Sequence, residues 1–331
     1  MILCQLSKYC QCHIARIKCK IKNISEVNMK NVLVTGGTGF VGEKIVAMLN
    51  ARMDIGNVYV TTRNANINGK KNGKVTYCLW NPLTENTPDI PLSEIHSVIN
   101  LMGENIASGR WSEERKKRIY NSRIIGTKNL ISFLNKEATS LESFISTSAI
   151  GIYEPNTNEL IDENTPVDQD SWLASVCIDW EKTLDELQRG RKVILRVGVV
   201  LDGNGGAIEK MKLPFLMGVG GILGDGKQFM SWIHRDDLSE LYITSIFDEN
   251  FSGVYNAVAP EPVTNTSFTK ILGSVINRPT IFPVPSFVLK TLFGDMSSVL
   301  LDGHRVIPQR LKEMNYRFHY PHLTLALEEI F

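Results

Sequence analysis

The stretch Asn31-Val-Leu-Val-Thr-Gly-Gly-Thr-Gly-Phe-Val-Gly42 decides the fold class of this chain. A β-branched run leads into glycines at 36, 39 and 42, and a helical pattern follows over Glu43–Asn50. The first glycine permits a tight turn, the second lets the backbone approach a pyrophosphate, and the third lets the helix pack closely on the strand. The helix N-terminus then offers unpaired N–H groups to phosphates. A plain strand-to-helix turn is the alternative, but the order of strand, turn and helix favours dinucleotide binding.

Short β-branched runs alternate with helical patterns along the body of the chain. We expect strands at Val32–Thr35, Val58–Thr62, Val75–Leu79, His96–Leu101, Ser143–Thr147 and Val193–Val197, and further helices at Ser112–Leu134 and Ser171–Leu187. This alternation predicts an α/β fold, a Rossmann-type doubly wound parallel sheet with right-handed crossovers. After about Gly203, clustered glycines and prolines indicate a smaller C-terminal α+β lobe over the carboxyl ends of the sheet.

The pattern divides the chain into three parts. Residues 1–28 form a basic extension with one acid, Glu26, residues 29–203 the NAD(P)-binding Rossmann domain, and residues 204–331 a substrate-side lobe, some elements of which return to the core. The extension fits a mitochondrial transit peptide, a disordered tail, or translated sequence ahead of a start at Met29. Its Cys10-Gln11-Cys12-His13 run lacks a second pair at finger-like spacing, so we expect no metal site.

The composition excludes some classes of partner. Of the 331 residues, 43% are hydrophobic, and the formal net charge is +1, so the global balance gives no reason to expect nucleic acid or a membrane surface as a partner. No apolar run approaches the ~20 residues of a transmembrane helix. The cysteines, four of them in the first nineteen residues, suggest no disulfide framework. We therefore expect a protein of the cytoplasm or the mitochondrion.

The end of the second strand bears on the choice of cofactor. An acid there usually bonds the ribose 2′-OH of NAD. Val60-Thr61-Thr62-Arg63 has no acid and ends in arginine, whose guanidinium matches a phosphate in charge and geometry. This favours NADP over NAD, with Thr62 as a further hydroxyl contact. The alternative is that Arg63 is an ordinary surface arginine.

Several motifs together narrow the family. Thr35–Gly42 resembles the fingerprint of extended short-chain dehydrogenase/reductase (SDR) proteins. Other segments resemble an atypical branch, the SDR epimerase family with a C-terminal domain of unknown function; they are Asn100-Leu-Met-Gly-Glu-Asn105, Arg110-Trp111, Ser122-Arg123, Trp180-Glu181, Trp232–Leu238 and His304–Arg310. The resemblance spans about residues 30–330. By analogy with SDR dimers, the two long helices imply a homodimer.

The resemblance implies an NADP-type cofactor. Its expected contacts are Gly36, Thr38, Gly39, Phe40, Val41, Gly42, Thr62, Arg63, Leu101, Met102 and Gly103. Met102 stands where the family usually has alanine, which would narrow the pocket. Arg123 on the long helix is a further candidate; the alternative is that it is a helix-surface arginine.

The resemblance also implies a catalytic hydroxyl and a Tyr-x-x-x-Lys pair that passes a proton as hydride moves. Ser148, at the end of the fifth strand, is the candidate hydroxyl, although it could simply cap the strand. In register with Trp180-Glu181, the Tyr and Lys positions fall on Leu173 and Cys177, and neither side chain can do that work. Tyr153 is the nearest remaining phenol, a candidate proton donor or a packing residue.

Two substrate-side candidates come from the C-terminal lobe, Trp232 and His234. The alternative for His234 is a structural role at a strand-to-helix corner, with Asp236 capping the helix. We expect an NADP-dependent oxidoreductase or epimerase for a small, polar or nucleotide-linked substrate. The alternative is an NADP-binding regulatory or sensor protein with little or no turnover, because the Tyr-x-x-x-Lys pair is missing.

Overall fold

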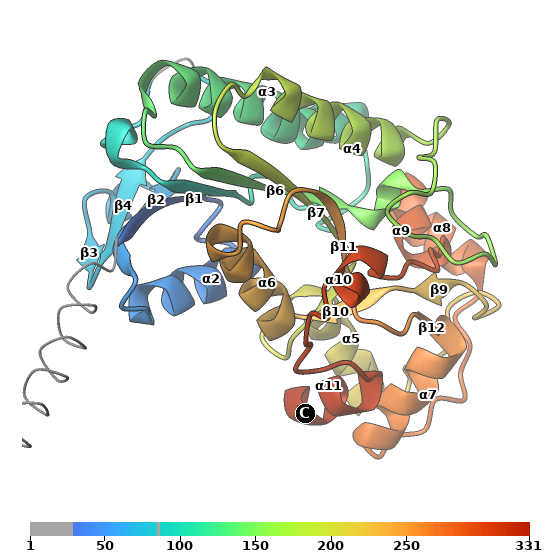
Figure 1. Ribbon diagram of the computed structural model, residues 1–331. Helices are drawn as coiled ribbons and strands as arrows, with labels where there is room; N and C mark the ends of the chain where they lie inside the picture. The colour runs from blue at the N-terminus through green and yellow to red at the C-terminus, as the bar shows by residue number, and fades with distance from the viewer. Residues whose placement is uncertain (1–28, 85–86) are drawn as a thin grey trace, which may run out of the picture.

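The computed structural model describes residues 29–84 and 87–331 (Figure 1). Its centre is an eight-stranded sheet in the order β11-β7-β6-β5-β1-β2-β4-β3, parallel throughout except for the β3–β4 pair. The strands are β1 Lys30–Thr35, β2 Ile55–Thr62, β3 Lys71–Asn72, β4 Val75–Leu79, β5 Ser97–Asn100, β6 Ser143–Ala149, β7 Arg191–Val197 and β11 Gly253–Ala257. The predicted Rossmann-type sheet is confirmed, including all six expected strands.

Helices cover both faces of the sheet. α3 (Glu113–Glu137) and α4 (Trp172–Lys182) lie on one face, and α2 (Phe40–Ala51) and α6 (Arg235–Phe247) on the other (Figure 1). Strand β1 shows why, since Val32, Leu33 and Val34 are all fully buried. Leu33 packs in the core beneath α3, whereas its two neighbours pack in the core beneath α2 and α6. A strand buried on both faces needs a helical layer on each.

The two long helices begin where the sequence predicts. The Ser112 hydroxyl accepts a hydrogen bond from the Arg115 N–H, and the Ser171 hydroxyl accepts one from the Ala174 N–H. Both are serine N-caps of the preferred kind. The second helix is shorter than expected, because after Lys182 the chain tightens into a 3₁₀ turn, η4 (Thr183–Glu186). Further 3₁₀ turns are η1 Ala65–Ile67, η2 Leu92–Glu94, η3 Ile150–Ile152 and η5 Gly294–Ser297.

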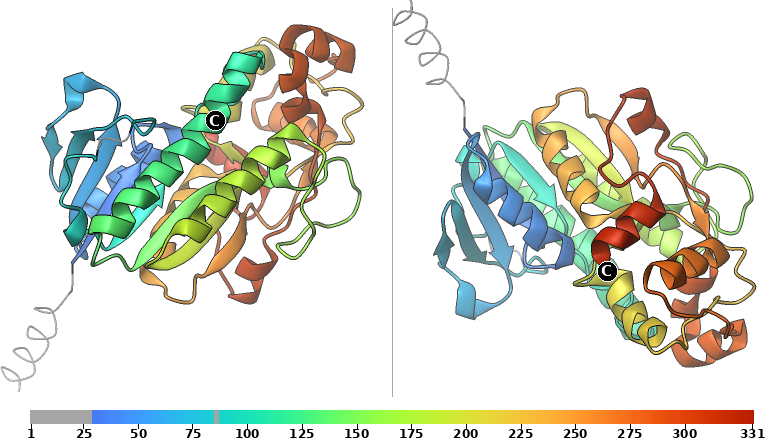
Figure 2. Two further views of the ribbon diagram at one scale, coloured as in Figure 1. Left: turned by 90° about the horizontal axis from the view of Figure 1, so that it is seen from above. Right: turned by 90° about the horizontal axis from the view of Figure 1, so that it is seen from below.

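The smaller C-terminal α+β lobe is also confirmed (Figure 2). Two short ladders pair β8 with β10 and β9 with β12. The elements are β8 Val199–Leu201, α5 Gly206–Leu216, β9 Phe229–Met230, β10 Trp232–His234, β12 Val263–Thr264, α7 Asn265–Val275, α8 Ser286–Phe293, α9 Ser298–Leu301, α10 Gln309–Glu313 and α11 Leu323–Ile330. Because β11 and α6 join the sheet layers, a boundary at 203/204 stays a prediction.

Strand order reverses between β1 and β5, which is the topological switch point of an open α/β sheet. The glycine turn follows β1 and the segment from Leu101 follows β5, so both begin at the same edge of the sheet. Within residues 29–84 and 87–331, no helix is both long and apolar enough to span a membrane. The basic extension and its Cys10–His13 run lie outside the described residues.

Candidate dinucleotide site and active site

Two of the three motif glycines are required by the packing of the chain itself. Gly36 has φ +69°, and a Cβ there would lie 2.6 Å from the Leu101 carbonyl oxygen. A Cβ on Gly42 would lie 2.4 Å from the Gly36 carbonyl oxygen. Both positions are therefore closed to any other residue without a shift of the backbone.

Gly39 is different, because little in the chain requires a glycine there. Its φ is −90°, and a Cβ would meet only the Gly36 carbonyl oxygen, at 3.2 Å. Gly39 is exposed and is the N-cap of α2, where no side chain caps the helix. The N–H groups of the first turn, at Phe40, Val41 and Gly42, have no partner within the helix. An exposed glycine beside uncapped donors fits a diphosphate.

The rim of this turn carries the other residues expected to hold the cofactor. Thr38 is exposed, and Phe40 and Val41 are half-buried. Thr62, at the end of β2, is buried, and its hydroxyl accepts a hydrogen bond from the Asn64 N–H at 3.1 Å. Arg63 is exposed, and no ion pair of its guanidinium occurs in the described part of the chain.

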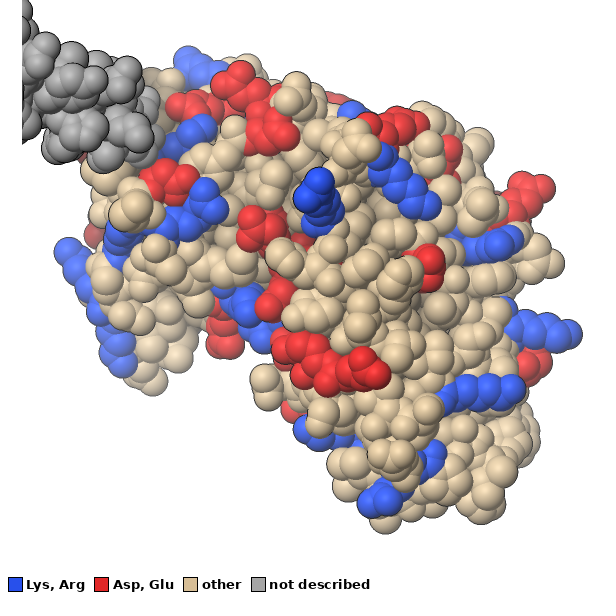
Figure 3. All heavy atoms as spheres, turned by 60° about the horizontal axis from the view of Figure 1, so that its bottom comes forward, with Lys and Arg blue, Asp and Glu red and all other residues tan. Residues whose placement is uncertain are grey.

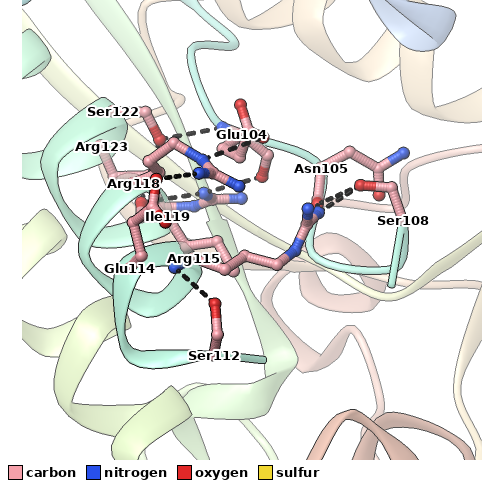
Figure 4. A network of polar contacts seen from close by, with 10 residues as sticks. All are labelled: Glu104, Asn105, Ser108, Ser112, Glu114, Arg115, Arg118, Ile119, Ser122 and Arg123. Atoms are coloured by element: carbon pink, nitrogen blue, oxygen red, sulfur yellow. Dashed lines mark hydrogen bonds and ion pairs between the residues drawn. The ribbon is translucent and has the colours of Figure 1, made fainter. Parts of the chain in front are cut away.

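The loop after β5 is held by side chains from one face of α3 (Figure 4). Arg123 donates to the carbonyl oxygens of Glu104 at 3.1 Å and Ile119 at 3.2 Å. Its guanidinium lies 5.2 Å from the centre of the Trp180 ring, and a Cβ on Gly103 would lie 2.8 Å from the guanidinium carbon. Burial lowers the pKa of Arg123 from its usual value. Arg123 thus supports the loop, and its contact with a cofactor stays a prediction.

Two more side chains of α3 fix the same loop. Ser122 accepts a hydrogen bond from the Glu104 N–H at 2.9 Å, and Arg115 donates to the Asn105 carbonyl oxygen at 2.5 Å and to the Ser108 hydroxyl (Figure 4). Sequence reasoning missed Arg115, because nothing in its spacing marks it among the many basic residues of this helix. Met102 is buried in the core beneath α3, next to Gly126, and its contact with a cofactor stays a prediction.

The two candidate catalytic hydroxyls belong to one buried polar network. Ser148 donates to the Glu181 carboxylate at 2.6 Å. Arg196 binds both oxygens of that carboxylate, at 2.8 Å each, and donates to the Tyr153 hydroxyl at 2.7 Å. Tyr153 in turn donates to the Asn256 side-chain oxygen at 2.9 Å. The structure thus connects Ser148 and Tyr153 through an ion pair rather than by direct contact.

The Ser148 and Tyr153 hydroxyls each donate their hydrogen to another member of this network. Ser148 is 1% exposed and Tyr153 is 0% exposed. Burial raises the pKa of Tyr153 above its usual value, although the positive charge of Arg196 opposes the shift. Arg196 and Asn256 were missed at the sequence level. A signal existed, since Arg196 is the one charged residue in the apolar run Val193-Ile-Leu-Arg-Val197, and a charge in a buried strand needs a partner.

Comparisons with known proteins fit this geometry. Residues 32–173 match the model of the NAD dependent epimerase/dehydratase family, and residues 284–330 match a domain of unknown function, DUF1731. The mouse epimerase family protein SDR39U1 is 34% identical over 303 residues, which cover 90% of this chain and 99% of the relative. The chain belongs to the SDR39U1 epimerase family.

Bacterial relatives and solved structures agree with this assignment. YfhF of Bacillus subtilis is 34% identical over 91% of this chain and 97% of its own length. Human SDR39U1 (isoform 2), solved with NADPH, has a TM-score of 0.81 at 32% identity, covering 91% of this chain and 98% of that one. UDP-glucose 4-epimerase of Thermus thermophilus, solved with NAD, covers 91% of this chain and 98% of its own with a TM-score of 0.69, but at 20% identity it shows the fold alone.

Within this family member, α4 carries Leu173 and Cys177 one helical turn apart. Leu173 packs against Gly151, and Cys177 is buried. Burial raises the pKa of the Cys177 thiol to about 12, so the thiol stays neutral near pH 7. These two positions therefore supply neither an acidic phenol nor a permanent cation.

The two substrate-side candidates are both buried. Trp232 donates from its indole N–H to the Glu261 carbonyl oxygen at 3.2 Å. His234 accepts a hydrogen bond from the Asp236 N–H through Nδ1, and its Nε2 lies 3.0 Å from the Glu329 carboxylate. The expectation that Asp236 caps α6 is wrong, because the His234 ring is the cap and Asp236 pairs with Lys44 at 2.8 Å. Substrate contact by Trp232 or His234 stays a prediction.

Proposed function

We propose that this protein is an NADP-dependent oxidoreductase or epimerase of the extended SDR type. The observation that carries the proposal is the exposed N-cap glycine, Gly39, where uncapped helix N–H groups follow and a Cβ would meet one chain atom, the Gly36 carbonyl oxygen at 3.2 Å. The human relative solved with NADPH supports the same assignment. When bound, a nicotinamide dinucleotide supplies a hydride donor or acceptor.

Preference for the phosphorylated cofactor rests on Arg63. This exposed guanidinium follows Thr62 at the end of β2, where NAD-preferring sites have an acid. The test is a fluorescence titration of Arg63→Ala with NADPH and with NADH. We expect NADPH binding to weaken roughly tenfold or more, consistent with the ~1.5–3 kcal/mol of a charged hydrogen bond, and NADH binding to change little. An equal loss for both cofactors would remove the reason for preferring NADP.

Ser148 and Glu181 take the part of the missing Tyr-x-x-x-Lys pair in this proposal. Because the Ser148 hydrogen points to Glu181, the Ser148 oxygen has lone pairs left for a substrate hydroxyl. During oxidation, the substrate proton moves to Ser148 while the Ser148 proton moves to Glu181. Arg196 keeps the carboxylate in place from the far side.

The catalytic proposal is tested by turnover of NADPH against carbonyl compounds and nucleotide sugars. We expect Ser148→Ala to lower turnover by about 10²-fold or more, the usual range for a positioned proton-transfer group, with NADPH affinity unchanged. A matched variant, Ser146→Ala, removes a neighbouring buried hydroxyl of β6 and should retain activity. Unchanged turnover in Ser148→Ala refutes the assigned role.

A second function, that of an NADP-binding sensor with little or no turnover, is favoured by one observation. Ser148 and Tyr153 are both buried, so a substrate reaches either only if neighbouring chain moves. The double variant Leu173→Tyr/Cys177→Lys separates the two functions. An enzyme that works through Ser148 turns over before and after this change, whereas a sensor whose buried hydroxyls admit no substrate shows no turnover in either form.

We also propose a substrate class, an oligomeric state and a cellular location. The substrate is a small polar or nucleotide-linked molecule. The protein is a homodimer through α3 and α4, which sedimentation velocity tests. It resides in the cytoplasm or the mitochondrion, which imaging of the full chain with a C-terminal tag tests.

A further inference from the structure

The C-terminal lobe exposes an unusual amount of large apolar surface. Six side chains of the α5 end and of the segment before α8 are 41–73% exposed; they are Leu213, Leu216, Met217, Val219, Ile281 and Phe282. Single exposed apolar residues are ordinary, but a contiguous set marks an interaction site.

The two segments that carry these side chains lie side by side. Arg278 donates to the Leu216 carbonyl oxygen at 2.9 Å, and the Val284 N–H donates to the Ile222 carbonyl oxygen at 2.8 Å. A short parallel bridge joins Leu223 to Val284. The exposed residues therefore form one face, although about sixty residues separate the segments along the chain.

The two segments that form this face are also basic. Residues 210–224 and 262–294 contain five basic residues, Lys210, Lys212, Lys270, Arg278 and Lys290, and no Asp or Glu. Exposed acids lie only at the ends of these ranges, at Glu209, Asp225, Glu261 and Asp295. The whole chain, by contrast, has 36 basic and 35 acidic residues. In Figure 3 the lower part of the surface is mostly tan with scattered blue atoms, and red atoms gather above it and at its right edge. We call the six apolar and five basic residues the apolar-basic face.

An open depression lies at the edge of the apolar-basic face. Its volume is about 450 Å³, and Lys270, Ser274, Arg278 and Thr280 are among the residues that line it. It adjoins Ile281 and Phe282 directly in sequence. A polar, basic depression beside protruding aliphatic and aromatic side chains fits a charged head group whose acyl chains lie next to it.

We propose that the apolar-basic face docks the protein peripherally on an anionic membrane surface. The exposed side chains of Ile281, Phe282 and Met217 enter the acyl boundary, and the lysines and Arg278 bind the lipid phosphates. The near-zero net charge of the whole chain gives no sign of this site, because the excess of basic over acidic residues is local. The inference does not depend on the proposed enzymatic function.

The test is co-sedimentation of the full-length protein with phosphatidylcholine vesicles that contain or lack phosphatidylserine. We expect binding only to the anionic vesicles, and weaker binding as salt screens the lysines. Ile281→Asp/Phe282→Asp should abolish binding. Lys212→Gln/Lys270→Gln should lower the partition coefficient roughly 25-fold, since each basic residue near such a surface contributes about a fivefold factor.

The control is Met53→Asp, which places the same charge on a 90% exposed methionine just before β2, outside the apolar-basic face. It should bind anionic vesicles like the unmodified protein, and all variants should keep their melting temperature. No binding to anionic vesicles, or equal loss with Met53→Asp, overturns the proposal. So does a change of sedimentation coefficient in Ile281→Asp/Phe282→Asp without vesicles, because the face would then join two copies of the chain.

Discussion

Replacing Arg196 by methionine removes the charge that holds the Ser148 network together. Methionine keeps most of the length of the side chain in β7, so the change is chiefly one of charge and hydrogen bonding. The Glu181 carboxylate would remain in place without its cation. The side chains of Arg196 and Glu181 are only 7% and 13% exposed, so little water can replace the lost partner.

The size of the effect follows from this burial. Breaking a buried ion pair by removing one partner typically costs ~3–5 kcal/mol of unfolding free energy. A loss of that size lowers the melting temperature of a chain of this length by roughly 4–7 °C, because the unfolding entropy grows with the number of residues. Adding Glu181→Gln to Arg196→Met removes the stranded charge while an amide oxygen still accepts from Ser148. The double variant should therefore regain about half of the loss.

Urea unfolding followed by tryptophan fluorescence measures both variants. Arg118→Met is the matched control, because it breaks only solvent-accessible ion pairs, with Glu114 at 2.9 Å and with Glu104 at 4.0 Å, and should cost under ~1 kcal/mol. If Arg196→Met costs no more than Arg118→Met, the pair is not buried as described. If Glu181→Gln worsens Arg196→Met instead of relieving it, the carboxylate is not the group left unpaired.

Three further predictions concern the turn, the thiol and the helix cap. Gly39→Ala should keep its melting temperature but lose most of its NADPH affinity in a fluorescence titration. Gly42→Ala should melt at a lower temperature, because its Cβ would lie 2.4 Å from a backbone atom. Equal destabilisation by the two substitutions would contradict the idea that Gly39 is reserved for a ligand. Cys177 should resist iodoacetamide at pH 8 until the protein is unfolded, as peptide mass spectrometry can show, because its pKa is raised to about 12. Since that pKa exceeds the unfolded value near ~8.5, Cys177 contributes stability that is lost as pH rises above the unfolded value, and Cys177→Ala should flatten this alkaline loss. His234→Ala should cost about 1–2 kcal/mol in thermal unfolding through the lost cap, and His234→Asn should recover part of it; full stability in His234→Ala would show that the ring is not needed as a cap.

Sequence patterns that span a few residues were enough to predict the architecture but not the polar network of the site. The strands and long helices could be predicted because hydrophobic period, serine caps and glycine turns act over a few residues. The polar network could not, because Ser148, Glu181, Arg196 and Asn256 come from four separate elements. The alternative that placed Asp236 at the cap of α6 was wrong for a different reason, because a sequence does not show which of two nearby side chains turns back to the helix.

By itself, then, the sequence determined the phosphate turn, the parallel sheet and the SDR family, because each depends on residue type at fixed short spacing. Tertiary structure decided which glycine leaves room for a ligand and which hydroxyls are buried against an ion pair. It also brought two acid-free segments together into one apolar-basic face. These features depend on distances between residues far apart in the chain, and only the packing of helices on the sheet sets such distances.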